Sequence, residues 1–367
     1  MKGLAVVSKL ALFSILLLLP WQLLAMEKLR IFTWAGYVTA ENITQVNEIL
    51  ISKGYNYQVE VITTKAEDAD QMFAVIRNKQ CDITFLTLFF IKMHGEQISR
   101  LLQPININSP RLSNYKNLDP KLTHIAMGMQ QGKPLYIPWG GGVYGFFVDT
   151  NKVKQEDIPT SVKDLWAAKW RNKFSLNQGQ FWYNVGLTLQ ALDFHPFYLE
   201  QLAQKNDRSA LKELLAKQGV VLNKFKQLYN NAGGFWQSST KFNDNLEIVS
   251  SWGPEIKRQN EHGGKWQLIN FKEGHLAWLD TINFVRELKG DKLAAAEVVA
   301  NYFIDKKVQQ RIVDELSMLP ASVNLDSRGL LDHYPNLFNA DLFVPPYSQL
   351  SYSLMQQMVE QVTDERE

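Results

Sequence analysis

The sequence predicts an α/β protein built as two lobes with a ligand cleft between them. Strand-like and helical segments alternate along the chain, which is typical of α/β architecture. The 342 residues that follow position 25 (367 − 25) are enough for two domains of ordinary size. Two strand-like stretches, at 135–149 and 278–285, are candidates for crossings between the lobes. Lobes joined by such strands form a hinged cleft, which is a common place for a ligand.

The first part of the chain predicts a βαβαβ pattern of short apolar strands and amphipathic helices. The first helix has Thr39 or Asn42 as its candidate cap. The second helix carries Met72, Val75 and Ile76 on one face. In order, the predicted segments are strand 29–33, helix 39–52, strand 59–63, helix 68–78 and strand 83–86.

The rest of the chain predicts further short elements around the two crossings. Three consecutive glycines, Gly140 to Gly142, relax the backbone within the first crossing. In order, the predicted segments are crossing 135–149, a capped short helix 161–166, strand 174–176, helix 181–192, strand 246–252, crossing 278–285 and an amphipathic helix 297–315. We therefore expect lobe 1 to hold residues 26–143 and 280–323, and lobe 2 to hold residues 144–279 and 324–367.

The first 25 residues predict a secretory signal peptide rather than a part of the fold. Lys2 and Lys9 form a positive start, and the apolar core at 10–19 is too short for a comfortable membrane span. Residues 23–25 are a plausible cleavage site before Met26, and no cysteine stands there to carry a lipid anchor. We expect the mature chain to be soluble and exported, and periplasmic in a bacterium.

Charge and cysteine content exclude some classes of protein. Without Lys2 and Lys9 the formal net charge falls from +2 to 0, because residues 1–25 hold no acidic side chain. A nucleic-acid-binding protein needs a basic footprint, so we expect no nucleic acid partner. The one cysteine, Cys81, cannot form an internal disulfide. Its place at a probable strand start favours a small buried apolar residue over a reactive thiol.

Common catalytic and cofactor motifs are not found in the sequence. The six histidines are scattered and form no helical metal pair. The three glycines at 140–142 are not followed by the Lys-Ser/Thr of a phosphate-binding loop, and no G-x-S-x-G elbow occurs. We therefore expect no metal, cofactor or catalysis. A binder of anions or metal ions and an exported enzyme are the rival classes.

The most informative feature is Asp280, two residues after Trp278 in an otherwise apolar strand-like segment. Strand alternation places the two side chains on the same face. The face of an indole attracts an organic cation, and a carboxylate accepts hydrogen bonds from its ammonium group. Trp34, Tyr37 and Trp252 follow other predicted strands. The set predicts a site for an organic cation; the alternative interpretation is that these are core aromatics and a turn aspartate.

These residues lie in stretches that resemble the periplasmic polyamine-binding proteins, the spermidine- and putrescine-binding components of ABC importers. The likeness runs over nearly the whole mature chain, and its Trp-x-x-Tyr and Trp-x-Asp elements are fairly specific together. The stretches that carry it are 32–37 (Phe-Thr-Trp-Ala-Gly-Tyr), 81–87 with the aromatic pair Phe89 and Phe90, 137–140, 164–166 and 277–281 (Ala-Trp-Leu-Asp-Thr).

The resemblance implies a type II solute-binding fold, with two crossover strands, that closes like a clamp on a polyamine. By position, Trp252 and Trp278 would stack on the methylene chain of the ligand, and Asp280 would hold an ammonium group. The full set of ligand-binding residues that we expect is Trp34, Tyr37, Thr87, Phe89, Trp182, Trp252, Trp278 and Asp280.

The chain departs from the family pattern around residues 177–182. The spermidine binders carry acidic residues there that hold one end of the ligand, whereas this chain has amides and aromatics. Amide oxygens can still accept hydrogen bonds from an ammonium group. Glu255, just after Trp252, is a candidate replacement carboxylate, and its alternative interpretation is a solvated surface residue.

The chain also resembles the norspermidine-sensor branch of this family, which docks on a membrane-bound cyclic-di-GMP enzyme and influences biofilm formation. We expect a monomer that closes on norspermidine or spermidine and signals to an inner-membrane protein of GGDEF/EAL type. The alternative is the substrate-binding subunit of a spermidine/putrescine ABC importer, with a permease as partner. The pocket does not separate these roles, because the partner surface on the two lobes decides between them.

Overall fold

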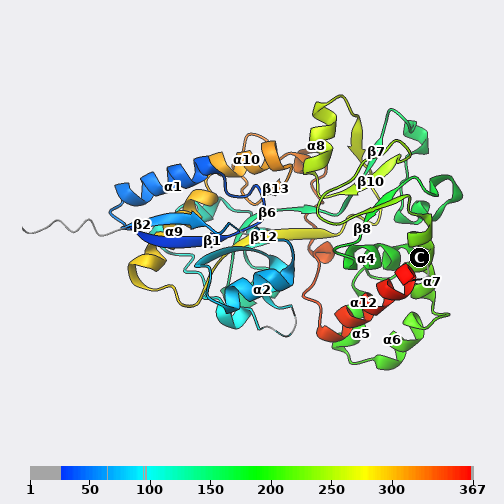
Figure 1. The fold of residues 1–367 in the computed structure, drawn as a ribbon, viewed down its shortest axis with the longest axis horizontal. Coiled ribbons are helices and arrows are strands. Elements are labelled where there is room, and N and C mark those ends of the chain that lie inside the picture. Colours follow the sequence, from blue (N-terminus) through cyan, green and yellow to red (C-terminus); the bar gives the residue numbers. More distant parts are fainter. Residues whose placement is uncertain (1–25, 64, 94, 96, 365–367) are drawn as a thin grey trace, which may run out of the picture.

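The computed structural model describes residues 26–63, 65–93, 95 and 97–364, which fold into two lobes placed end to end (Figure 1). The two-lobed α/β architecture predicted from the sequence is confirmed. The predicted signal peptide lies outside the described residues.

A mixed six-stranded sheet in the order β13-β6-β12-β3-β1-β2 forms lobe 1. β1 runs parallel to β2 and β3, whereas β12 runs antiparallel to both β3 and β6. Figure 1 shows α1 and α10 on one side of this sheet and α2 on the other. The strands are β1 (Glu27–Phe32), β2 (Tyr57–Val61), β3 (Ile83–Thr87), β6 (Ile137–Val143), β12 (Ala277–Phe284) and β13 (Leu319–Pro320), beside a small hairpin of β4 (Met129–Gln130) and β5 (Lys133–Pro134).

A three-stranded antiparallel sheet in the order β10-β7-β11 forms lobe 2, beside the parallel pair β8 and β9. The chain enters this lobe at Tyr144, between β6 and β7, and leaves it just before β12. The backbone N–H of Tyr144 donates to the carbonyl of Leu276 over 2.8 Å, so the two crossings lie side by side. The exact lobe limits stay a prediction. The strands are β7 (Gly145–Asp149), β8 (Ser175–Asn177), β9 (Gly234–Trp236), β10 (Ile248–Ser251) and β11 (Trp266–Leu268).

The helices cover both sheets and include most of those predicted. Their bounds are α1 (Ala40–Ser52), α2 (Ala69–Arg77), α3 (Pro120–Thr123), α4 (Trp182–Ala191), α5 (Tyr198–Gln204), α6 (Arg208–Leu215), α7 (Val220–Asn231), α8 (Pro254–Glu261), α9 (Gly290–Phe303), α10 (Lys306–Leu316), α11 (Leu330–His333) and α12 (Gln349–Asp364). None of them, within the described part of the chain, has the length and apolar character needed to cross a membrane.

Local capping signals are confirmed where they position lobe 1. Thr39 caps α1, and Asn42 completes a capping box by accepting from the backbone N–H of Thr39. Asp68 caps α2 without a capping box, by accepting a hydrogen bond from the backbone N–H of Gln71. The prediction of a buried, unreactive Cys81 agrees with its environment, since burial raises the pKa of its thiol to about 12.

The prediction of one helix over 297–315 is wrong. α9 ends at Phe303, and α10 begins at Lys306. Asp305 caps the second helix by accepting a hydrogen bond from the backbone N–H of Lys307 over 3.0 Å. The apolar spacing continues across the break because Ile304 is itself fully buried, so hydrophobic periodicity alone did not reveal it.

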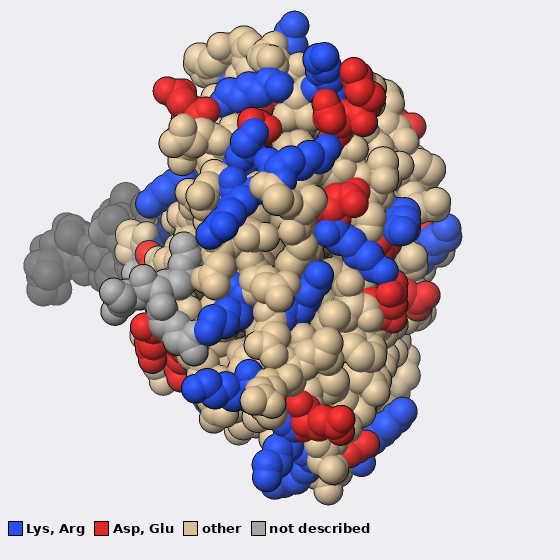
Figure 2. Space-filling model, turned by 90° about the vertical axis from the view of Figure 1, so that its right-hand side faces the viewer, with Lys and Arg blue, Asp and Glu red and all other residues tan. Residues whose placement is uncertain are grey.

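The outer end of lobe 2 carries charges of both signs. Figure 2, which faces this end, shows Lys and Arg side chains spread over the surface with Asp and Glu among them. Several are paired, as in Lys163 with Asp193 at 2.6 Å. Exposed pairs of this kind contribute little to stability.

Candidate ligand site between the two sheets

Asp280 lies at the centre of the six-stranded sheet, on β12. Its register partners are Thr87 at the end of β3 and Gly140 on β6. Antiparallel pairing brings the start of β12 to the carboxyl end of β3, the edge of an α/β sheet where ligands commonly bind. The Asp280 side chain is only 3% exposed. A carboxylate is rarely buried without compensating partners, so this position indicates a specific role.

Two hydroxyl groups donate hydrogen bonds to Asp280. The Tyr37 hydroxyl donates to Oδ2, and the Thr87 hydroxyl donates to Oδ1 over 2.7 Å. A carboxylate has about four acceptor positions, so these two donors leave acceptor capacity for a further donor such as an ammonium group. The structure thus brings together three of the predicted site residues from three separate segments.

Burial raises the pKa of Asp280 to about 7, and the hydrogen bonds from Tyr37 and Thr87 lower it in part. Desolvation disfavours the charged form of a carboxyl group, whereas a cation beside it favours that form. The site is therefore poised between neutral and charged near pH 7 and would become fully ionised beside a bound cation. Perturbed carboxyl groups of this kind cluster at functional sites.

Tyr37 reaches Asp280 from the tight turn that follows β1. Its ring packs on Trp139 with centroids 4.3 Å apart and meets Phe85 edge-on at 6.1 Å. Gly36 stands at φ +81° in this turn, a conformation that glycine adopts without steric cost. Trp34, at the start of the turn, is half-buried, and its indole N–H is buried with no hydrogen-bond partner within the described residues.

Trp278 packs closely against the glycine run of β6, with its indole against Gly142. A Cβ atom at Gly142 would lie 2.7 Å from Cζ2 of Trp278, and one at Gly141 would lie 2.3 Å from the Trp278 carbonyl oxygen. Real Cβ atoms do not approach that closely, so the glycines are required for this packing. The sequence predicts that the glycines relax the backbone at the crossing. The structure shows that Gly141 and Gly142 also leave space for Trp278.

Gly142→Ala is expected to displace the Trp278 indole. We expect a stability loss of about 1–3 kcal/mol from overpacking, together with weaker ligand binding. Thermal unfolding and calorimetric titration of the variant check both effects. Gly234→Ala is the matched control, because a Cβ atom there has no neighbour closer than 3.9 Å. Equal behaviour of the two variants would contradict the role of Gly142.

Trp252 faces Trp278 from lobe 2. The two indoles meet edge-to-face with centroids 6.3 Å apart, and Trp252 also contacts the rings of Tyr183 at 5.0 Å and Tyr144 at 5.2 Å. Burial raises the pKa of the Tyr183 phenol, and the nearby charge of Asp280 raises it further. Tyr183 and Tyr144 were not among the predicted site residues. Their contacts with Trp252 bring together distant segments of lobe 2, and Tyr183, which directly follows the predicted Trp182, also interacts with the charge of Asp280.

Phe89 and Trp182 form a second contact between the lobes. Their rings meet edge-to-face at 6.1 Å, and the side chains are 2% and 5% exposed. Both are packed among other aromatics, as in the 4.6 Å contact of Phe89 with Phe90. The structure therefore places them in aromatic packing at the lobe interface.

In the segment 177–182, which lacks carboxylates, the Asn177 side chain makes hydrogen bonds within the protein. The side chain of Asn177 accepts from the backbone N–H of Gln180 over 2.6 Å and donates to the carbonyl of Gln237 over 2.7 Å. Glu255 lies in the first turn of α8 and pairs with Arg258 at 3.1 Å. The pairing gives the Glu255 carboxylate a local partner, although its side chain is only 15% exposed and is therefore not a solvated surface residue.

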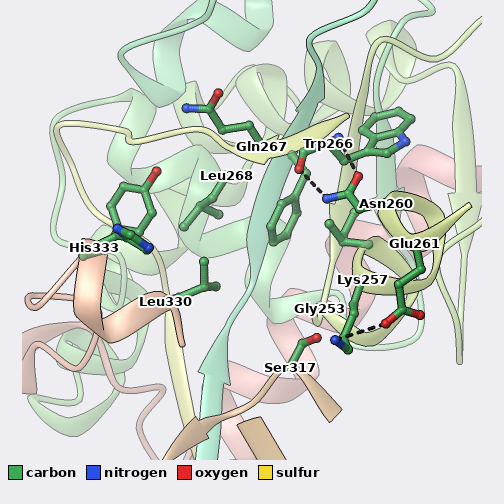
Figure 3. Close-up of a pocket in the computed structure, with 13 residues that line it drawn as sticks. Gly253, Lys257, Asn260, Glu261, Trp266, Gln267, Leu268, Ser317, Leu330 and His333 are labelled. Carbon is green, nitrogen blue, oxygen red and sulfur yellow. Dashed lines mark hydrogen bonds and ion pairs between the residues drawn. The ribbon is translucent and has the colours of Figure 1, made fainter. Parts of the chain in front are cut away.

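Two surface cavities lie elsewhere. One of about 620 Å³ is bordered by α8, β11 and α11, and Figure 3 shows the Lys257–Glu261 pair and the Asn260–Trp266 hydrogen bonds along its wall. The other, of about 580 Å³, lies between α1 and α10. Neither is lined by a predicted site residue. Within the described residues, no three His, Cys, Asp or Glu side chains group so as to hold a metal ion.

Comparison with known families identifies the class of protein. The sequence matches the family of bacterial extracellular solute-binding proteins over residues 84–337, which is more than half of the chain. The chain belongs to this family. No curated protein sequence matches it.

Solved structures share the fold of this solute-binding protein. One is the spermidine/putrescine ABC transporter substrate-binding protein PotD from Streptococcus pneumoniae, with a TM-score of 0.70 and 16% identity over 93% of this chain and 100% of that one. Another is the Tp0655 (TpPotD) lipoprotein of Treponema pallidum, with a TM-score of 0.65 and 13% identity over 92% and 99%. A third, AfuA from Actinobacillus pleuropneumoniae with fructose-6-phosphate bound, has a TM-score of 0.59 and 16% identity over 92% and 99%. The predicted type II fold is confirmed, and because these relatives bind unlike molecules, the ligand must be argued from the site.

Proposed function

We propose that this protein binds a linear polyamine in the periplasm and delivers it to a membrane partner. The observation that carries the proposal is the buried Asp280 carboxyl group, held by Tyr37 and Thr87 and lying on the same strand as Trp278. An ammonium group would take the remaining acceptor positions of the carboxylate. The methylene chain would lie against Trp278 and Trp252, where the lobes meet.

The contacts are sufficient for useful affinity. Each cation–π contact contributes roughly 0.5–2 kcal/mol, and a hydrogen bond to a charged group about 1.5–3 kcal/mol. Micromolar binding requires about 8 kcal/mol. Three aromatic rings and one carboxylate sum to roughly 3–9 kcal/mol, and the upper end of that sum reaches the free energy that micromolar binding requires. An anion would instead meet the Asp280 carboxylate with no compensating basic side chain from the predicted set.

The proposed role is that of the substrate-binding subunit of an ABC importer. This was the alternative in the sequence-based prediction, and PotD-like transporter components of the same fold support it. The sensor role, with norspermidine as ligand and a cyclic-di-GMP enzyme as partner, rests on the sequence resemblance alone. A pull-down of the ligand-loaded protein from membranes distinguishes the two. Recovery of an ABC permease supports import, and recovery of a GGDEF/EAL-type protein overturns it in favour of sensing.

The ligand is tested by thermal unfolding of the mature protein with norspermidine, spermidine, spermine, putrescine and neutral controls. A ligand at 1,000 times its Kd stabilises the folded state by about 4 kcal/mol, which corresponds to a rise of several degrees in Tm. A rise with polyamines alone supports the proposal and ranks the ligands. If none of the polyamines raises the Tm, the proposal is overturned and the aromatic cluster is assigned to packing between the lobes. Chemical turnover of any amine by the protein would instead indicate an enzyme.

Binding is expected to strengthen as the pH rises through 7. The ligand needs the Asp280 carboxylate, whose pKa is about 7 before binding, while the amine stays protonated up to about pH 10. Below pH 6 the apparent affinity should fall about tenfold for each pH unit, and above pH 8 it should level off. Calorimetry in buffers of different ionisation enthalpy should show proton release near pH 6–7. A flat pH profile with no proton release would remove Asp280 from the site.

A further inference from the structure

Arg311 supports the turn that carries Tyr37 through hydrogen bonds from its guanidinium group. Its Nη2 donates to the carbonyl of Tyr37 over 2.7 Å, and its Nη1 donates to the carbonyl of Gly36 over 3.4 Å. Nη1 also pairs with Glu315 one turn along α10, at 3.1 Å. The Arg311 side chain is only 14% exposed.

The Tyr37 ring of the turn packs on Trp139 and Phe85, but the backbone of the turn is less firmly held. Its internal backbone hydrogen bond, from the N–H of Tyr37 to the carbonyl of Trp34, is long at 3.5 Å. On its outer side it rests on α10, because a Cβ atom at Gly36 would lie 3.4 Å from the Leu316 side chain. Arg311, on α10, lies 274 residues after Tyr37 in the sequence. The position of the turn therefore depends on a helix that no local sequence signal connects with it.

We propose that Arg311 is a positioning residue that fixes the backbone of the turn so that the Tyr37 hydroxyl reaches Asp280. The planar guanidinium fork suits this task, because it donates in two directions at once from one rigid group. A lysine ammonium at the same position reaches one carbonyl but not both with the same rigidity. Loss of the fork lets the turn shift, and the Tyr37–Asp280 hydrogen bond weakens with it.

The test measures the titration of Asp280 in the ligand-free protein by carboxyl ¹³C NMR of Asp-labelled protein. The signal that is lost in the Asp280→Asn variant identifies the Asp280 carboxyl group. Tyr37→Phe removes one hydrogen bond that lowers the Asp280 pKa, so its midpoint should rise by about half to one pH unit. Thr87 and Tyr183, the other groups that interact with Asp280, stay unchanged. Arg311→Met should also raise the Asp280 midpoint. The double variant with Arg311→Met and Tyr37→Phe should have the same midpoint as Tyr37→Phe alone.

Two further variants complete the design. Arg311→Lys should restore part of the wild-type midpoint, and it also serves if Arg311→Met fails to fold. Glu315→Gln removes the exposed ion-pair partner but leaves both carbonyl contacts, so its midpoint should stay at the wild-type value. A wild-type midpoint in both folded Arg311 variants, or fully additive shifts with Tyr37→Phe, would overturn the proposal.

The inference rests on the proposed function only for its consequence in binding. With spermidine as the probe, Arg311→Met should weaken binding several-fold and move the pH profile upward by the same amount as the NMR midpoint. Absence of spermidine binding by the wild-type protein defeats the proposed function and leaves the NMR result standing. A raised NMR midpoint with unchanged spermidine affinity supports the positioning role and removes the Tyr37–Asp280 pair from ligand binding.

Discussion

Asp280→Asn is expected to weaken polyamine binding strongly and, at the same time, to stabilise the ligand-free protein above pH 7. The amide keeps the shape of the side chain and still offers an acceptor to Tyr37, but it brings no charge to an ammonium group. Removing one partner of a buried charge-assisted pair costs roughly 2–5 kcal/mol, or about 30- to 5,000-fold in affinity.

The gain in stability follows from the raised pKa of Asp280. Its folded-state pKa is about 7, whereas an unfolded aspartate titrates near 3.9. The folded state therefore holds the proton more tightly, and this contribution is complete below about pH 4 and lost as the pH rises through 7. An amide at position 280 avoids that loss, which is on the order of 2–4 kcal/mol.

The measurement is denaturant unfolding at pH 5 and pH 8, with and without spermidine. We expect the free energy of unfolding of the ligand-free Asn variant to be closer to that of the wild type at pH 5 and to be higher than it at pH 8. Glu255→Gln is the control, because it removes a carboxylate that pairs with Arg258 on α8. Retained spermidine binding by the Asp280 variant, or its loss in the Glu255 variant, would contradict the assignment.

Trp278→Ala is expected to lower polyamine affinity by about 10- to 100-fold without moving the pH midpoint of binding. The substitution removes a cation–π contact and the apolar wall for the methylene chain, while the Asp280 hydrogen bonds to Tyr37 and Thr87 remain. Calorimetric titration at pH 8 measures the loss, and Trp278→Phe should recover much of it.

Trp266→Ala provides a matched deletion for Trp278→Ala. Trp266 is also half-buried, but it lines the separate cavity beside α8 (Figure 3). The control should bind spermidine with wild-type affinity. Similar losses in the two variants would mean that the effect comes from general destabilisation rather than from a wall of the site.

Most of the fold was predictable because its signals are local. Apolar strands, cap residues such as Thr39 and Asp68, and the glycine run at the first crossing each act within a few residues. The break between α9 and α10 was missed although Asp305 is a good cap, because the buried Ile304 keeps the apolar period continuous. When a cap residue lies inside a continuous apolar period, the period predicts a single helix and the break at the cap is missed.

The candidate site was predictable in part. Strand alternation put Trp278 and Asp280 on one face, and the resemblance added Tyr37, Thr87 and Trp252. The two hydroxyl partners of Asp280 come from positions 243 and 193 residues away, and the sequence does not show that they converge on it. Tyr144, Tyr183 and Arg311 were missed for the same reason, since their roles depend on contacts between distant segments.

The sequence by itself determined the α/β class, the two crossings and the residue types suited to an organic cation. These follow from periodicity, backbone preference and side-chain chemistry, which are properties of neighbouring residues. Only the tertiary structure decided that Asp280 is buried, which hydroxyls hold it, and that its pKa lies near 7. Desolvation is set by the atoms that surround a group in space, and the atoms around Asp280 include Tyr37 and Thr87, which lie 243 and 193 residues away along the chain.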